Sequence, residues 1–340
     1  MLLMNVAASA LLSAVLIVLL MPVLRRYALA RPNARSSHKA PTPQGGGIAV
    51  VAAALIPVAG LLLWLAGPQA EYVWDGARSF RTFWAVAAAA IALAFLGAID
   101  DIRPLPVMPR LLLQILGVAV VVTLSPSILP VPSWIEVPLL VLAGLWFVNL
   151  VNFMDGLDWI TVAEMVPITG FIALLGWSGD VPATVAIVAA ALCGALLGFA
   201  PFNKPVAKLF LGDVGSLSIG LLVGWLLLNL AAHGGLAAAI LLPLYYLMDA
   251  TVTLLKRLAR GERVWEAHRS HFYQQATVNG FSALAVSAHV FALNLVLAAL
   301  AAVTLIWPSP SVSLAALLVG IVLVGLLLRH FAQARLETAR

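Results

Sequence analysis

The sequence predicts an all-α membrane protein, a single domain over residues 1–340 that crosses the bilayer about eleven times, with ten as the alternative count. Hydrophobic residues make up 63% of the chain and charged residues only 10%, whereas a soluble domain carries about 25% charged residues. Apolar runs of roughly 17–25 residues, the length that crosses a bilayer, recur along the whole chain. This composition excludes a soluble fold, and the net charge of +5 therefore does not indicate a nucleic-acid partner.

The apolar runs give the expected spans in order. They are residues 3–24, 47–66, 83–99, 111–126, 137–152, 159–176, 182–200, 214–232, 236–255, 285–307 and 312–329. The first run could be mistaken for a signal peptide, but no basic residue precedes it, and Arg25 and Arg26 follow it. This order of charges predicts an uncleaved anchor whose N-terminus lies outside.

The distribution of basic residues supports this orientation. With the N-terminus outside, 17 of the 19 Lys and Arg residues fall in cytoplasmic segments, and only Arg78 and Arg81 fall outside. Such a bias sets the orientation of a membrane protein and here predicts a cytoplasmic C-terminus. The expected cytoplasmic connections are residues 25–46, 100–110, 153–158, 201–213 and 256–284.

Five polar stretches occupy these cytoplasmic connections. The first, "RSSHKAPTPQGGG" (35–47), places His38 and Lys39 shortly before three glycines, whose backbone can approach a ligand closely. A phosphate or lipid headgroup site is one interpretation of this stretch, and an ordinary basic loop is the other.

The second stretch, "DDIRPLPVMPR", follows an apolar run directly. Asp100 and Asp101 are consecutive, so their side chains cannot point the same way: one could bind a metal or a basic partner while the other holds a neighbouring cation. Arg110 opens the next span and can reach back towards a phosphate. A charged helix end at the membrane interface is the alternative interpretation.

The third stretch is "NLVNFMDGLDWI". Asn149, Asn152 and Asp155 are spaced by three, so a continuing helix would place them on one face. Gly156 permits a turn, and Asp158 follows it. Carboxylate and amide oxygens suit a hard cation such as Mg²⁺, although a purely structural polar turn would use the same residues.

The fourth stretch, "NKPVAKLFLGDVGSLSIG", places Asp213 between glycines just before an apolar helix, with Lys208 and Phe210 ahead of it. Free N–H groups at a helix start favour an anion, and a simple helix cap would explain Asp213 equally.

The fifth stretch, "RGERVWEAHRSHFYQQ", carries His268 and His271 three residues apart, a spacing that predicts a shared helical face. With Arg269 they could bind a diphosphate. A metal site and a plain basic surface helix are the alternatives.

Acidic metal ligands and basic phosphate ligands gathered on one side of a membrane bundle predict Mg²⁺-assisted phosphoryl transfer. A secondary transporter is the alternative from another class, but it would place its charges near the bilayer midplane. Only Asp249, and in a similar way Glu164, lie inside predicted spans. A membrane scaffold without activity leaves the glycine-flanked aspartates unexplained.

The motifs "HKAPTPQGGG", "DDIRPLP", "NLVNFMDGLD", "FLGDVGS" and "HRSHFYQ" resemble, in order and spacing, those of the polyprenyl-phosphate N-acetylhexosamine-1-phosphate transferases. The resemblance spans about residues 1–330. It implies that UDP-HexNAc and polyprenyl (undecaprenyl) phosphate react to give polyprenyl-diphospho-HexNAc and UMP. The reaction would need Mg²⁺, with Mn²⁺ as a substitute. It would take place on the cytoplasmic face of the bacterial inner membrane, among membrane lipids. Many family members are homodimers, so the resemblance also implies a homodimer as a partner state.

The resemblance also implies a role for each motif residue. The implied catalytic residues are Asp100, Asp101, Asp155, His268 and His271. The implied metal ligands are Asp213 and Asn152. The implied nucleotide-binding residues are Asp158, Phe210 and Asn149. The implied phosphate- and lipid-binding residues are Arg110, Lys208, Arg269, His38 and Lys39.

Two features within this resemblance predict the sugar. The phospho-MurNAc-pentapeptide transferases of the superfamily carry consecutive histidines where this chain reads "HRSHFYQ", and "SSHKAPTPQGGG" is more similar to the branch that initiates O-antigen. We therefore expect GlcNAc, or a deoxy relative such as QuiNAc or FucNAc, in the first membrane step of cell-envelope polysaccharide synthesis. Phospho-MurNAc-pentapeptide is the alternative.

Overall fold

The computed structural model describes residues 1–30, 41–65, 76–263 and 268–334. Within these ranges the regular secondary structure is helical, apart from one antiparallel pair of two-residue strands, β1 (Leu29–Ala30) and β2 (Thr42–Pro43). The long helices are α1 (Leu2–Tyr27), α2 (Gly47–Leu65), α4 (Gly76–Ile102), α5 (Val107–Leu124), α6 (Ser133–Met154), α7 (Ile160–Ser178), α8 (Ala183–Phe199), α9 (Asp213–Leu230), α13 (Ala283–Ile306) and α14 (Pro310–Ala332). The shorter ones are η1 (Ala231–Gly235), α10 (Leu236–Leu241), α11 (Leu244–Ala259) and α12 (Phe272–Val278).

The predicted class, an all-α multi-pass membrane protein, is confirmed. In the part of the chain that the structure describes, nine helical segments are long and apolar enough to cross a membrane, and α8 is a shorter apolar helix of 17 residues. Helix α9 is buried along most of its length, whereas only a minority of the residues of α1, α13 and α14 are buried. Helix α9 is therefore central, and the outer helices present apolar side chains of the kind that face lipid.

Two predicted boundaries were wrong. The expected span 236–255 is not one helix, because it breaks near Pro243 into α10 and α11. Proline has no N–H and its ring clashes with the preceding turn, so it interrupts a helix. The expected span 83–99 begins later and ends earlier than the helix, since α4 extends over Gly76–Ile102.

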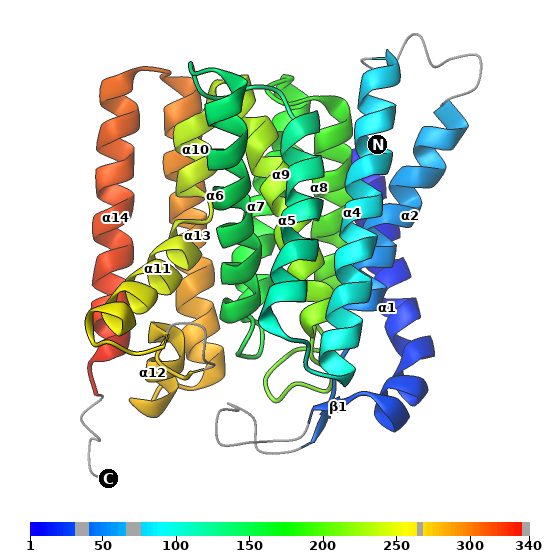
Figure 1. Cartoon of the computed structure of the whole chain (residues 1–340), viewed down its shortest axis with the longest axis vertical. Coiled ribbons are helices and arrows are strands. Elements are labelled where there is room, and N and C mark those ends of the chain that lie inside the picture. The colour runs from blue at the N-terminus through cyan, green and yellow to red at the C-terminus, as the bar shows by residue number, and fades with distance from the viewer. Residues whose placement is uncertain (31–40, 66–75, 264–267, 335–340) are drawn as a thin grey trace.

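The connections that carry the polar motifs meet at one end of the bundle. Figure 1 shows the links after α4, α6, α8 and α11 together at the lower end, where the C-terminus also lies, while the N-terminus is in the upper half. Helix α11 runs obliquely at the edge of the bundle, and α12 lies beneath it. The fold thus brings motifs that are far apart in the sequence to a single end.

Candidate active site

A cavity of about 680 Å³ opens at this end of the bundle. Its walls come from the end of α4, the α6–α7 link, the α8–α9 link and α12. The predicted site residues that line it are Asp101, Asn152, Asp155, Asp158, Phe210 and Asp213. The volume is within the range of pockets that enclose ligands of small-molecule size.

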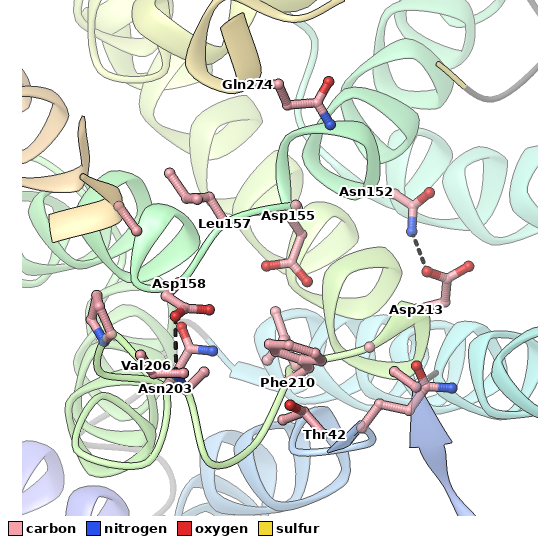
Figure 2. A pocket seen from close by; sticks show the side chains of 18 of the residues that line it. Thr42, Asn152, Asp155, Leu157, Asp158, Asn203, Val206, Phe210, Asp213 and Gln274 are labelled. Atoms are coloured by element: carbon pink, nitrogen blue, oxygen red, sulfur yellow. Dashed lines mark hydrogen bonds between the residues drawn. The ribbon is translucent and has the colours of Figure 1, made fainter. Parts of the chain in front are cut away.

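Asp213 is the first residue of α9 and faces Asn152 at the end of α6 (Figure 2). The Asn152 side-chain amide donates to Asp213 Oδ1 at 2.8 Å and to Ser216 Oγ at 2.9 Å. The sequence places these two predicted metal ligands 61 residues apart. The structure brings them into direct contact on the cavity wall.

Asp101 connects α4 to the start of α9. Its carboxylate accepts from the backbone N–H of Asp213 at 3.1 Å and of Val214 at 3.3 Å. The first N–H groups of a helix have no partner within the helix, so a carboxylate at this position satisfies them and favours the helix start. Asp101 therefore lines the cavity and also holds Asp213 in place.

Asp100 points away from its neighbour, as two consecutive helical residues must. It accepts from the Leu105 N–H at 2.6 Å and pairs with Arg110 at 2.9 Å. Neither Asp100 nor Arg110 lines the cavity, but Asp100 lies close enough to Asp213 to interact with it electrostatically. The predicted catalytic residue Asp100 and the predicted phosphate-binding residue Arg110 thus contact each other.

Glycines allow the helices around Asp213 to approach each other closely. A Cβ on Gly97 of α4 would lie 2.3 Å from the Asp213 carbonyl, and one on Gly47 of α2 would lie 2.2 Å from the Cα of Gly215. Side chains at these positions cannot be accommodated without moving the start of α9. Gly47 and Gly97 therefore allow the close helix packing that positions the central aspartate.

The turn between α6 and α7 carries two further cavity carboxylates. Asp155 accepts from the Thr161 hydroxyl, and burial raises its pKa to about 8, with the charges of Asp213 and Asp101 adding to the rise. Asp158 Oδ2 accepts from the Ala207 N–H at 3.0 Å (Figure 2), which connects this turn to the α8–α9 link.

Trp159, the next residue, adopts a left-handed backbone with φ of 65°. A bulky residue holds such a conformation only where its surroundings impose it. Asn203 imposes it here by accepting from the Trp159 N–H at 2.8 Å and donating to the Leu209 carbonyl at 3.0 Å. Asn203 was missed in the sequence, although it lies within the quoted "NKPVAK" motif.

The His268–His271 stretch is not helical, so the prediction of a shared helical face was wrong. Helix α12 begins only at Phe272, and His271 is the residue before it. The two imidazoles nevertheless stack, with ring centroids 4.8 Å apart. Burial, with His271 and Arg257 nearby, lowers the pKa of His268 to about 4, so this ring is neutral near pH 7. The Nε of Arg269 is buried and has no hydrogen-bond partner in the described structure.

Seven predicted site residues in the described part of the chain do not line the cavity: Asn149, Lys208, His268, Arg269, His271 and, as described above, Asp100 and Arg110. The buried Asn149 amide donates to Gln114 Oε1 on α5 at 2.8 Å, because the face of α6 that bears it packs against α5. Lys208 is exposed and is absent from the cavity wall. His38 and Lys39 lie outside the described residues. Gln274 of α12, not predicted from sequence, lines the cavity and is buried.

The donor set fits Mg²⁺ better than a softer metal. In the described part of the chain, no three His, Cys, Asp or Glu side chains converge as a metal cage. Mg²⁺ does not need one, since it usually takes one or two carboxylates and completes its shell with water and substrate phosphates. Asp213 and Asn152 supply oxygens of this kind at the cavity wall.

The fold and cavity define a multi-pass membrane protein with an acidic site at one end of its helical bundle. Residues 83–231 match the family described as glycosyl transferase family 4. This match covers less than half of the chain, and it is consistent with the polyprenyl-phosphate N-acetylhexosamine-1-phosphate transferase superfamily that the motifs of the chain resemble.

Curated relatives are consistent with the same superfamily. The chain is 25% identical over 286 residues to a probable undecaprenyl-phosphate N-acetylglucosaminyl 1-phosphate transferase of Bacillus subtilis, covering 78% of this chain and 75% of the relative. It is 27% identical over 295 residues to a decaprenyl-phosphate N-acetylglucosaminephosphotransferase of Mycobacterium leprae, covering 76% and 72%. A phospho-N-acetylmuramoyl-pentapeptide-transferase of Halalkalibacterium halodurans is 27% identical over 198 residues, covering 57% and 59%.

Proposed function

We propose that this protein transfers N-acetylhexosamine-1-phosphate from a UDP-sugar to polyprenyl phosphate, releasing UMP. Relatives named for transfer to undecaprenyl and decaprenyl phosphate support the reaction class. The observation that carries the proposal is the contact of Asp213 with Asn152 and Asp101 in one cavity wall. That cavity lies at the end of a membrane bundle, where a lipid phosphate can meet a water-soluble nucleotide.

The reaction follows from the chemistry of the two substrates. An oxygen of the lipid phosphate attacks the β-phosphorus of the UDP-sugar, and the bond from that phosphorus to the oxygen bridging to the α-phosphate breaks as UMP leaves. Direct attack is favoured over an aspartyl-phosphate intermediate, because the lipid phosphate is already an anionic nucleophile. The protein's main task is to position the two phosphates in line.

Each part of the cavity has a task in this proposal. Asp158 and Phe210 bind the uracil, by hydrogen bonding and by stacking, and the cavity holds both side chains. Asp213 and Asn152 would hold Mg²⁺, which when bound offsets the charge of the diphosphate. Asp101 keeps Asp213 at the start of α9.

The proposed donor is UDP-GlcNAc or a deoxy relative such as UDP-QuiNAc or UDP-FucNAc. Two of the relatives described above are named for N-acetylglucosamine and one for N-acetylmuramoyl-pentapeptide. The stretch "HRSHFYQ" lacks the consecutive histidines of the pentapeptide transferases. We place the active site on the cytoplasmic face of the bacterial inner membrane, because most basic residues lie at that end of the predicted topology.

Purified protein tests this proposal when incubated with undecaprenyl phosphate and a panel of donors: UDP-GlcNAc, UDP-QuiNAc, UDP-FucNAc and UDP-MurNAc-pentapeptide. We expect UMP release and a lipid-linked sugar with at least one of the first three donors, and loss of both with EDTA. Solute uptake into proteoliposomes without UMP release would instead support a transporter. UMP release only with the pentapeptide donor would refute the proposed sugar.

A further inference from the structure

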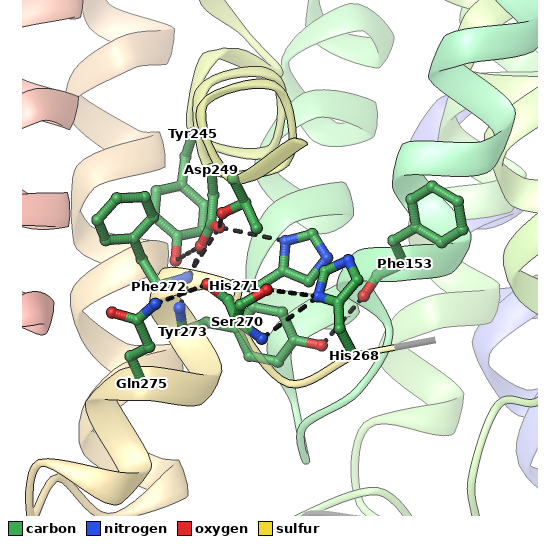
Figure 3. A network of polar contacts seen from close by, with 10 residues as sticks. Phe153, Tyr245, Asp249, His268, Ser270, His271, Phe272, Tyr273 and Gln275 are labelled. Carbon is green, nitrogen blue, oxygen red and sulfur yellow. Dashed lines mark hydrogen bonds and ion pairs between the residues drawn. The ribbon is translucent and has the colours of Figure 1, made fainter. Parts of the chain in front are cut away.

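Asp249 is a fully buried carboxylate in the middle of α11, and it does not line the cavity. A buried ionisable residue in a membrane bundle is costly and persists when it has specific partners. The partners of Asp249 lie at the start of α12, more than twenty residues further along the chain. Figure 3 shows this network.

Both carboxylate oxygens of Asp249 bind backbone N–H groups. Oδ1 accepts from Phe272 at 2.9 Å and Oδ2 accepts from Tyr273 at 3.1 Å. These are the first two N–H groups of α12, which have no partner within the helix. Hydroxyls on α11 complete the set, since Tyr245 donates to Oδ2 and Thr253 donates to Oδ1, each at 3.3 Å. A residue of α11 therefore caps α12 and fixes it against the bundle.

The same carboxylate contacts His271, whose Nδ1 lies 3.4 Å from Asp249 Oδ1. His271 stacks on His268, and Ser270 Oγ lies 2.7 Å from His268 Nδ1. The contacts thus extend from Asp249 inside the bundle to His268, a predicted site residue.

A second anchor shows where this assembly sits. The Tyr273 hydroxyl donates to the Phe153 carbonyl at 3.0 Å, next to Asn152 on α6. A Cβ on Gly156 would lie 2.2 Å from that hydroxyl, so the turn bearing Asp155 packs directly on α12. Gln274, the next residue of α12, is part of the cavity wall. The start of α12 is therefore held between Asp249 and the acidic turn of the site.

We propose that Asp249 is a positioning residue for the nucleotide-sugar site, which sets His271 and the start of α12 and, through them, His268 and Gln274. It does so without contacting substrate. The inference rests on the proposed function for its kinetic test, but the contacts it invokes are independent of the reaction.

A double-mutant cycle tests whether Asp249 acts through His271. With the best donor, Asp249→Asn and His271→Ala should each lower kcat/KM by about tenfold or more, mainly through a higher KM for the donor. If they act as a unit, Asp249→Asn should cost less than about threefold in the His271→Ala background. Independent losses that multiply in the double variant would overturn the proposal.

Glu164→Gln is the matched control, because Glu164 is also a fully buried carboxylate. The Glu164 carboxylate accepts hydrogen bonds from the Tyr246 N–H and from the Asn294 side-chain amide, not from the His268–Tyr273 stretch. The factor by which Glu164→Gln lowers kcat/KM should multiply with the factor for His271→Ala in the double variant. If the losses of kcat/KM fail to multiply in this control as well, any buried carboxylate would give the same result. That outcome would also overturn the proposal.

Two measurements keep the test decisive if Asp249→Asn is inactive or poorly folded. Asp249→Glu retains two acceptor oxygens and should recover activity relative to Asp249→Asn; a Glu variant no better than the Asn variant contradicts the proposal. Hydrogen exchange of the Phe272 and Tyr273 amides should be faster in folded Asp249→Asn than in wild type, and unchanged exchange in that variant contradicts the proposal. Failure of wild-type protein to release UMP would refute the proposed function alone, because the exchange measurement needs no turnover.

Discussion

At the scale of single residues, the carboxylates in and beside the cavity differ in the groups that they contact. Asp101 accepts two backbone N–H groups, and Asp100 beside it binds Arg110. Asp155 is half-buried on the cavity wall, accepts from one hydroxyl and has a raised pKa. Three acidic residues that look alike in the sequence therefore have separate tasks: an anchor, an ion pair and an acid with a raised pKa.

Asp155 gives a prediction about how the stability of the protein depends on pH. Burial raises the pKa of Asp155 to about 8, far above its ordinary value near 3.9, so the folded state holds one more proton than the unfolded state between about pH 4 and 8. Stability from this group is present below that range and is lost as pH rises through it. In magnesium-free buffer, the Tm of wild type minus that of Asp155→Asn should fall from pH 5 to pH 8.

The difference between the two proteins is needed because His268 acts in the opposite sense. Its pKa is lowered to about 4, so the unfolded state binds the extra proton and stability rises with pH between about 4 and 6.5. This contribution is common to both proteins and cancels. A Tm difference that is flat or rises with pH would show that Asp155 is ionised in the folded protein throughout.

At the scale of elements, the start of α9 is positioned by close contacts with α2 and α4. Gly47 and Gly97 allow α2 and α4 to approach the turn that carries Asp213, and Asp101 caps the helix from the end of α4. The position of one side chain thus depends on how closely three helices pack.

Gly97→Ala tests this dependence without touching a polar group. Its Cβ would lie 2.3 Å from the Asp213 carbonyl, so α4 and α9 must separate. We expect turnover to fall by about tenfold or more, since small misplacements of a reacting group are costly. Gly60→Ala on α2 is the control, because nothing lies within 4 Å of its Cβ, and it should keep wild-type turnover. Full activity of Gly97→Ala would contradict this dependence, because it would show that the placement of Asp213 does not require close packing of α4 against α9.

Some elements could be predicted from the sequence and others could not. The length of the apolar runs located the membrane helices, since it depends on local composition. The start of α12 was missed, because its cap comes from Asp249 on α11 rather than from a neighbouring residue. Asn149 was assigned to the site from helical spacing, which cannot show that α5 packs against that face.

At the scale of the whole molecule, five separated motifs meet at one end of a membrane bundle (Figure 1). Their order and the distribution of basic residues predicted this convergence. Which motif residues face the cavity was not predictable, since Asp101 lines it and Asp100 does not. That distinction depends on how α4 is rotated against α9, a tertiary property.

The central claim is that sugar-phosphate transfer takes place at the cavity wall around Asp213. The most direct test is the rate of Mg²⁺-dependent UMP release by Asp213→Asn, compared with Asp180→Asn, an exposed position between α7 and α8. We expect Asp213→Asn to lose about a hundredfold or more in kcat at saturating Mg²⁺ while staying folded, and Asp180→Asn to match wild type. Near wild-type turnover by folded Asp213→Asn would contradict the account.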